Sequence, residues 1–219
     1  LISYARKLSV PGLQVGGNAK IIYRRVGEFG QAWGFGLDAA AQYQRKNWRF
    51  SAVARDVTGT FNAWTYTLDQ RTVEVFQQTG NELPANSVEV TLPRLVLGAA
   101  HSFTLGSKLN LLAEVDLENT FDGKRNTVIA SDTWSADPRV GIELGYAQVV
   151  YLRGGINMMQ YITDESGARQ LTMQPNLGLG VRIKSFHLDY ALSRIAQGDD
   201  QLFSNIFSLR FDLFKKGQS

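Results

Sequence analysis

The sequence predicts an all-β protein, an antiparallel transmembrane β-barrel of the kind found in bacterial outer membranes. Three observations predict it. Long segments alternate apolar and polar residues, so that each strand has one apolar and one polar face. Very short turns alternate with longer loops along the chain. The final segment, residues 202–214, is longer than the roughly 5–6 residues usual in soluble strands, and it ends on an aromatic residue, Phe214.

Composition excludes several other classes of protein. Hydrophobic residues make up 44% of the 219 residues and the mean hydropathy is −0.17. Such values are ordinary for a soluble domain, but a barrel gives the same values because only alternate residues meet lipid. No apolar run reaches the roughly 18 residues of a transmembrane helix. The absence of cysteine excludes disulfides and thiolate sites, and a net charge of +3 without a basic run does not indicate nucleic-acid binding.

Eleven segments have the length and alternation of strands. They are 1–8, 13–25, 31–45, 48–57, 88–103, 107–120, 133–147, 149–162, 171–184, 186–195 and 202–214. Short connections such as Lys46-Asn47 are expected to be periplasmic turns, and the longer ones, above all 58–87, extracellular loops. Residues 1–219 are therefore expected to form one barrel domain. Because a closed barrel with both ends in the periplasm has an even strand count, about three N-terminal strands are expected to be missing upstream.

Charged residues gather on the polar faces of these segments. An Arg or Lys facing lipid at mid-bilayer costs about 2–4 kcal/mol, so these residues are expected to line the lumen. The clearest candidates are Arg49, Arg55, Glu114, Asp116, Arg139, Glu143, Arg153, Arg182 and Arg210. On the apolar faces, aromatic residues lie toward strand ends, as the girdles at a membrane interface require. They are Tyr23, Trp33, Tyr43, Trp48, Tyr146 and Tyr190.

Two stretches resemble a known family. Residues 34–38 (Gly-Phe-Gly-Leu-Asp), followed by residues 55–64 (Arg-Asp-Val-Thr-Gly-Thr-Phe-Asn-Ala-Trp), resemble the PorV/PorQ family of Bacteroidota outer-membrane proteins, which are similar in fold to the FadL fatty-acid transporters. The resemblance implies a FadL-like barrel of fourteen strands in the full protein, about eleven of them in this chain. It also implies a place in a multi-protein envelope machine such as the type IX secretion system. The FadL relatives instead pass hydrophobic molecules through a lateral opening.

The long loop 58–87 carries the candidate contact residues. It holds many apolar side chains for an exposed loop, and exposed aromatic residues in quantity usually mark a contact. We expect Phe61, Trp64, Tyr66 and Phe76 either to bind a protein partner or to fold over the barrel's own mouth. Residues 71–77 alternate and are expected to form a short strand or hairpin. At the base of the loop, Arg55 and Asp56 are expected to form an ion pair that anchors it.

Catalytic and metal sites are weakly indicated. His187 shares a face with Asp189, and Ser185 and Ser193 are in phase, but no placed nucleophile completes a triad, so His187 and His101 are interpreted as lumen or interface residues. Acidic groups that could offer calcium ligands lack an organising spacing and are interpreted as solvated loop charge. They are Asp199 with Asp200, Asp116 with Glu118 and Asp122, and Asp132 with Asp137.

The expected function is therefore that of a non-enzymatic outer-membrane barrel subunit without cofactor or metal. Its expected partners are the lipid bilayer and other envelope proteins, which it binds through its outer loops, with no nucleic acid. The alternative is a FadL-like transporter of hydrophobic small molecules, with a lipid or fatty acid as its ligand.

Overall fold

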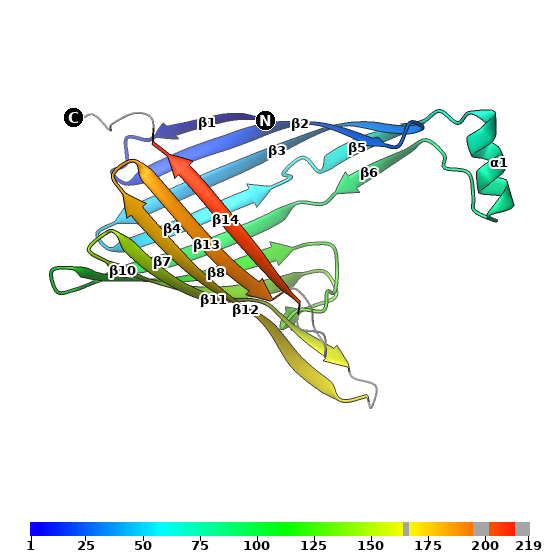
Figure 1. Cartoon of the computed structure of the whole chain (residues 1–219). Coiled ribbons are helices and arrows are strands. Elements are labelled where there is room, and N and C mark those ends of the chain that lie inside the picture. Colours follow the sequence, from blue (N-terminus) through cyan, green and yellow to red (C-terminus); the bar gives the residue numbers. More distant parts are fainter. Residues whose placement is uncertain (164–166, 195–201, 213–219) are drawn as a thin grey trace. The chain divides into compact units, whose positions relative to one another are not determined.

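The computed structural model of the chain describes residues 1–163, 167–194 and 202–212 (Figure 1). Fourteen strands and one short helix make up the described part of the chain. In chain order they are β1 (Ile2–Lys7), β2 (Leu13–Val26), β3 (Gly30–Arg45), β4 (Trp48–Arg55), β5 (Thr60–Tyr66), α1 (Gln70–Gln78), β6 (Ser87–Thr91), β7 (Arg94–Leu105), β8 (Leu109–Thr120), β9 (Ile129–Ala130), β10 (Ser135–Tyr146), β11 (Val150–Thr163), β12 (Arg169–Ile183), β13 (Phe186–Arg194) and β14 (Phe203–Phe211).

The strands form one sheet, and strands that are consecutive in the sequence are hydrogen-bonded neighbours in it, except that β5, β6 and β9 lie off the main strand order. The order is β1-β2-β3-β4-β7-β8-β10-β11-β12-β13-β14, with β5 paired to β3 and β6, and β9 paired to β10. Every pairing with a defined register is antiparallel. Among the described residues, the order starts at β1 and ends at β14 without a pairing between these two strands. The all-β, antiparallel prediction is confirmed, and the eleven segments correspond to the eleven strands of this path.

The chain divides into two compact units. Unit 1 comprises Leu1–Gln42 and Ala52–Leu95, and unit 2 comprises Tyr43–Ser51 and Val96–Ser219. In each unit the register keeps like side chains on one face, because directly paired residues on neighbouring strands point to the same side of a sheet. Leu177 of β12, for example, pairs with Leu192 of β13, whereas Arg182 pairs with His187. Each unit therefore has one apolar face and one polar face.

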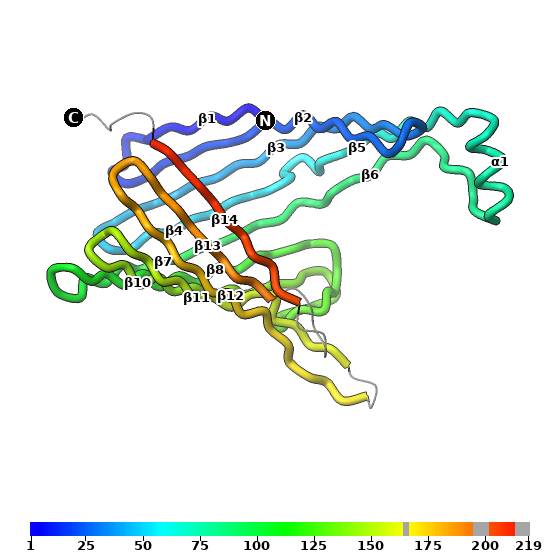
Figure 2. The backbone as a smooth tube through the Cα atoms, viewed as in Figure 1, coloured from blue at the N-terminus to red at the C-terminus, as the bar shows by residue number. Residues whose placement is uncertain are grey.

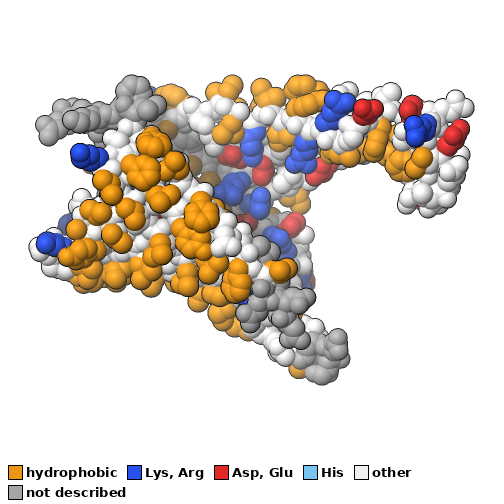
Figure 3. All heavy atoms as spheres, viewed as in Figure 1, with side chains coloured by type: hydrophobic (Ala, Val, Ile, Leu, Met, Phe, Trp, Pro, Cys, Tyr) orange, Lys and Arg blue, Asp and Glu red, His pale blue; other side chains and the backbone are white. Residues whose placement is uncertain are grey.

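The apolar faces are exposed. Phe207 of β14 is 73% exposed, Ile21 of β2 is 63% exposed and Leu177 of β12 is 60% exposed. Figure 3 shows hydrophobic side chains gathered over β13 and β14. Within the described residues, the only buried hydrophobic side chains are those of three alanines, Ala32, Ala100 and Ala136. These units therefore do not enclose a hydrophobic core, and their large apolar side chains point outward.

The segment expected to be one long loop is instead mostly regular structure, so that prediction is wrong. Residues 60–91, which we call the arm, run out along β5, turn through α1 and return along β6 (Figure 2). β4 and β5 both pair with β3, so they are two halves of one interrupted strand. The interruption is a tight turn in which the Gly59 amide donates to the Asp56 carbonyl at 2.8 Å, with positive φ at Asp56 (55°) and Gly59 (67°).

Residues 71–77 form helix α1 rather than the expected strand or hairpin. Asp69 is the N-cap, and its carboxylate accepts a hydrogen bond of 2.8 Å from the Thr72 amide. The pKa of Asp69 is lowered from its usual value, because hydrogen bonds from the Thr72 side chain and then from its amide stabilise the charged carboxylate. Phe76 packs edge-on against Phe29 with ring centroids 6.1 Å apart. The cap and this contact favour a helix over the extended form that alternation alone predicts.

Other boundaries also differ from expectation. The segment 88–103 is divided between β6 and β7, because Leu92 and Pro93 interrupt it and proline cannot donate to a ladder. β11 contains a bulge where the register shifts between Asn157 and Gln160, with positive φ at Met158 (49°). The end of the final segment, at Phe214, lies outside the described residues.

Candidate functional site

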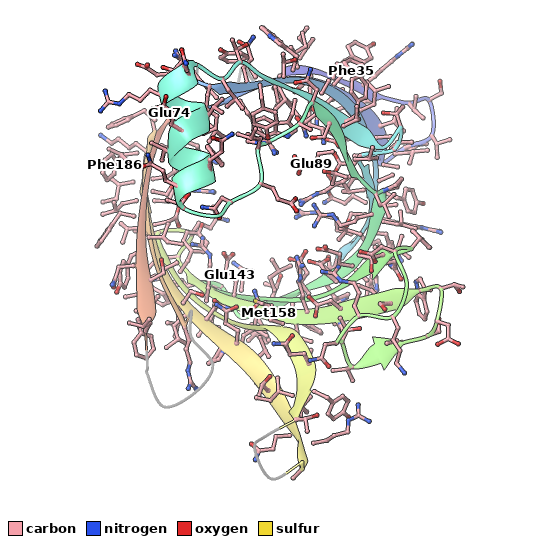
Figure 4. The ribbon with its side chains drawn as sticks, turned by 90° about the vertical axis from the view of Figure 1, so that its right-hand side faces the viewer. Phe35, Glu74, Glu89, Glu143, Met158 and Phe186 are labelled. Carbon is pink, nitrogen blue, oxygen red and sulfur yellow. The ribbon has the colours of Figure 1, made fainter. Side chains whose placement is uncertain are left out.

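The polar face of unit 2 collects most of the predicted lumen residues. Cross-strand register places Asp116 opposite Arg139, Glu143 opposite Arg153, and Arg182 in the same row as Arg210. Glu114 is opposite Gly141 on this face. Arg49 lies on it by alternation with Ser51, because a Cβ at Gly98 of β7 would meet both the Ser51 hydroxyl and the Asp116 carboxylate. In Figure 4 Glu143 and Phe186 lie on opposite faces of this unit.

The charges of this face are paired across strands. Arg139 binds Glu118 at 2.5 Å and lies 3.7 Å from Asp137. Arg153 of β11 binds two carboxylates, Glu143 of β10 and Asp189 of β13, each at 2.5 Å. One guanidinium therefore ties three strands together. Opposite charges therefore lie close together on this face, between adjacent strands as at Arg153 and Glu143 and across β12 as at Arg153 and Asp189.

His187 is at the centre of the next cluster, and its partners differ from those expected. Its Nε2 lies 3.0 Å from an Asp212 carboxylate oxygen, and its Nδ1 accepts from Arg182 Nε at 2.9 Å. Asp189 is engaged by Arg153 instead, so the shared face of His187 and Asp189 does not bring the two into contact as a pair. Ser193 is occupied by hydrogen bonds with Gln174 and Asn176. The two ring nitrogens of His187 face Arg182 and Asp212, and no hydrogen bond joins His187 to a serine among the described residues.

His101 lies among aromatic rings on the apolar side of β4 and β7. Its ring centroid is 4.5 Å from that of Trp48 and 4.3 Å from that of Phe103, and Trp48 stacks on Phe50 at 5.7 Å. Its Nδ1 is buried without a hydrogen-bond partner. The surroundings of His101 are those of an aromatic cluster near a tight turn, on the apolar face.

Unit 1 carries a separate polar cluster that sequence reasoning did not assemble. Lys20 of β2 donates to Asp38 of β3 at 2.7 Å and also to Asp56, which accepts a further hydrogen bond from Thr60. The expected Arg55–Asp56 pair is wrong, because Asp56 turns to Lys20. Arg55 instead lines a pocket of about 650 Å³ that borders the cluster, together with Arg94. One signal in the sequence could have found this cluster. Lys20 and Asp38 have opposite charges and lie on the polar faces of two consecutive strands.

The four predicted contact residues do not form one patch. Trp64 lies on the polar face, where its indole Nε1 donates to Glu89 at 3.2 Å and its ring stacks on Tyr66 at 5.9 Å. Phe61 pairs with Phe35 on the opposite, apolar face. Phe76 belongs to α1. Figure 4 shows Phe35 and Glu89 on opposite faces of unit 1. The apolar excess of this segment therefore reflects two sides of a β-ribbon and a helix.

Glycines of β3 let β5 approach closely. The side chain of Asn62 lies over Gly34, and that of Thr60 lies over Gly36. Asn62 is fully buried, and neither polar atom of its amide has a hydrogen-bond partner. A Cβ at Gly34 would collide with Asn62 and with the Phe61 carbonyl. The absence of side chains at Gly34 and Gly36 thus leaves the space that the side chains of Asn62 and Thr60 occupy.

No group of three or more metal-ligating side chains is arranged to hold an ion in the ranges that the structure describes, and Asp199 and Asp200 lie outside these ranges. The one helix of the described residues is too short and too polar to cross a membrane. No family model, curated protein or solved structure matches the chain.

Proposed function

We propose that this chain is part of an outer-membrane β-barrel, a non-enzymatic subunit of an envelope machine that binds a protein partner through the arm. The observation that carries the proposal is the inverted distribution of side chains. Large apolar groups are exposed on one face of each unit, while charged groups are paired on the other face. In water this arrangement is unfavourable by about 25 cal/mol for each Å² of exposed apolar surface, so the apolar face needs an apolar surrounding.

The length of β12 matches the thickness of a bilayer. Seven consecutive alternate positions of its apolar face, from Leu171 to Ile183, are apolar. Twelve residue steps of about 3.3 Å span roughly 40 Å along the strand. At the usual tilt of about 35–45° this corresponds to roughly 28–33 Å across the membrane, close to the hydrocarbon thickness of about 30 Å.

Aromatic clusters on the apolar faces support the same environment. Tyr23 and Trp33 contact each other in unit 1 at 4.8 Å, and Tyr190 contacts Phe207 in unit 2 at 4.9 Å. Arg169 lies over the ring of Tyr161 at 4.6 Å near the loop end of β11 and β12. Amphipathic rings and long cationic side chains of this kind prefer the membrane–water interface.

The arm favours the binding subunit over the transporter. It extends β5 and β6 as a ribbon and presents α1 with exposed Val75. Glu89 of β6 accepts hydrogen bonds from Trp64 of β5 and from Arg24 of β2, so the ribbon of the arm is held together and joined to β2. The alternative function requires an apolar binding cavity. The pocket of unit 1 is bordered instead by Lys20, Asp38 and Arg55, which suit a hydrophobic ligand poorly.

A matched pair of tryptophans tests the membrane part of the proposal. Trp33 and Trp64 lie on the paired strands β3 and β5, one register step apart, but point to opposite faces. In vesicles with brominated acyl chains, a variant that retains only Trp33 should be strongly quenched, and one that retains only Trp64 should not. Equal quenching of both residues, or of neither, contradicts the proposal.

The partner part is tested by co-purification of the tagged native protein in mild detergent. We expect a stoichiometric envelope protein that is lost when Val75 is replaced by Ser and retained when the exposed Gln78 is replaced by Ser. A lone barrel that carries bound fatty acid, unchanged by both substitutions, contradicts the subunit proposal and supports transport.

A further inference from the structure

A small hollow lies on the polar face of unit 2, close to Gly180. Gly180 of β12 lies between Tyr151 of β11 and Asp189 of β13, and Ser208 of β14 continues this row. A side chain at position 180 would meet Asp189 and Arg153. Those two side chains therefore fill the space over Gly180, and a pocket of about 180 Å³ lies beside them, which we call the arginine pocket. Its lining residues are Tyr151, Arg153, Val181, Arg182, His187, Asp189, Ser208 and Arg210.

Three guanidinium groups and one carboxylate line the arginine pocket. Arg153 is neutralised by Glu143 and Asp189, and Arg210 lies 3.4 Å from Asp212. Arg182 differs, because no carboxylate among the described residues lies within ion-pair distance of it. The pocket therefore holds one cationic group whose charge is not balanced by a neighbouring carboxylate.

The orientation of Arg182 is fixed by His187 and Tyr151. The Nδ1 of His187 faces Arg182 Nε at 2.9 Å and Arg210 Nη2 at 3.2 Å, and both of these nitrogens are donors. Nδ1 must therefore be the acceptor, and the ring proton is on Nε2, which donates to Asp212 at 3.0 Å. The guanidinium of Arg182 also lies 5.6 Å from the centroid of the Tyr151 ring. These contacts use the Nε of Arg182 and leave its terminal amino groups for a ligand.

We propose that the arginine pocket binds a phosphate group, as free phosphate or as a phosphate monoester. The arginine fork matches the spacing of two oxygens of a phosphate, and Arg is better suited than Lys to such bidentate binding. The hydroxyl of Ser208 lines the same pocket and offers a further donor. At about 30 Å³ for each water of liquid volume, the pocket has room for roughly six waters, which suits a tetrahedral oxyanion with residual hydration.

The test is calorimetric titration of the full chain, folded in detergent, with orthophosphate at constant ionic strength. We expect saturable binding with one phosphate per chain. Arg182→Gln should weaken binding about ten-fold or more, because a charge-assisted hydrogen-bonding pair is removed. Arg182→Lys, which keeps the charge but loses the fork, should be intermediate. Lys184→Gln removes one positive charge from the adjacent turn outside the pocket lining and should bind like the unmodified chain.

Two outcomes overturn the proposal. One is an absence of saturable binding by a chain whose circular dichroism shows the β-structure. The other is equal weakening by Arg182→Gln and Lys184→Gln, which identifies general charge attraction. Titration with glycerol 3-phosphate distinguishes the sources: binding tighter than that of orthophosphate indicates a monoester, and weaker binding indicates the free ion. Neither result depends on quenching by lipid, so this inference and the proposed function can fail separately.

Discussion

Replacing Leu177 by Arg discriminates between a lipid-facing and a water-facing sheet. Leu177 lies on the apolar face of β12 and is 60% exposed. Ile206 of β14 is a matched control, because it is 53% exposed but lies on the polar face, in register with Ala191. In water the two positions are equivalent, since both are exposed aliphatic side chains. In a bilayer only Leu177 contacts lipid.

The expected magnitude follows from the position of Leu177 along its strand. It is six residues from Leu171 (177 − 171) and six from Ile183 (183 − 177), the two ends of the apolar series. Six steps of about 3.3 Å place it roughly 20 Å from either end, which is the middle of the bilayer for a tilted strand. An Arg at the midplane of a barrel's lipid face lowers the free energy of unfolding by about 2–4 kcal/mol. Surface substitutions outside such features stay within roughly 0.5 kcal/mol.

The assay is denaturant unfolding of the protein in phospholipid vesicles, followed by tryptophan fluorescence, with the free energy of unfolding obtained by linear extrapolation. We expect Leu177→Arg to lose about 2–4 kcal/mol and Ile206→Arg to change by roughly 0.5 kcal/mol or less. Equal effects of the two substitutions refute the assignment of the faces. A larger loss at Ile206 reverses the assignment, and lipid then covers the polar side.

Three further predictions concern single contacts. Arg153→Met leaves both of its carboxylate partners unpaired and should lower the free energy of unfolding by about 0.5–2 kcal/mol, since each partly exposed pair contributes roughly 0.2–1 kcal/mol. An unchanged free energy of unfolding contradicts the idea that Arg153 links three strands. Gly34→Ala should cost about 1–3 kcal/mol through overpacking, whereas Gly141→Ala, where the nearest neighbour of a new Cβ is 4.0 Å away, should cost less than about 1 kcal/mol, both measured by unfolding. Because the pKa of Asp69 is lowered in the folded chain, its capping contribution is present above the unfolded pKa and is lost as the pH falls through the folded one. The protection factor of the Thr72 amide, which is its exchange rate relative to that of an unstructured chain at the same pH, should therefore fall on acidification, and in an Asp69→Ala variant it should be low at every pH.

Alternation was sufficient to predict the strands, because a period of two fixes which side chains share a face whatever the partner strand is. The prediction that Glu143 and Arg153 share a polar face needed no register, and the structure places them directly opposite each other. The pairing of particular charges did need register. Alternation placed His187 and Asp189 on one face, but only the β11–β12–β13 register shows that Arg153 pairs with Asp189.

The arm was missed for a different reason. Residues 71–77 alternate like a strand, and the features that make them helical depend on two residues outside that window, Asp69, which caps the helix, and Phe29, which packs on Phe76. Phe61 and Trp64 are three residues apart on one strand, so they necessarily face opposite sides. Counting apolar residues in a presumed loop therefore combined two surfaces into one. Assigning the side chains of residues 60–66 to two faces by their alternation would have separated the two surfaces.

The pattern of ion pairs bears on what the polar faces can do. A filter that selects ions presents rings of like charge or of carbonyl oxygens. In unit 2 the charges instead alternate between neighbouring strands, as at Arg139 with Glu118, and in unit 1 Lys20 is held between two carboxylates. Ion pairs of this kind hold the strands together. Because the opposite charges largely cancel, these faces exert little electrostatic attraction on a passing ion. Arg182 is the exception, since its charge is unbalanced in a shaped hollow. Selectivity on the polar face of unit 2 is therefore expected at that hollow and not along the face as a whole.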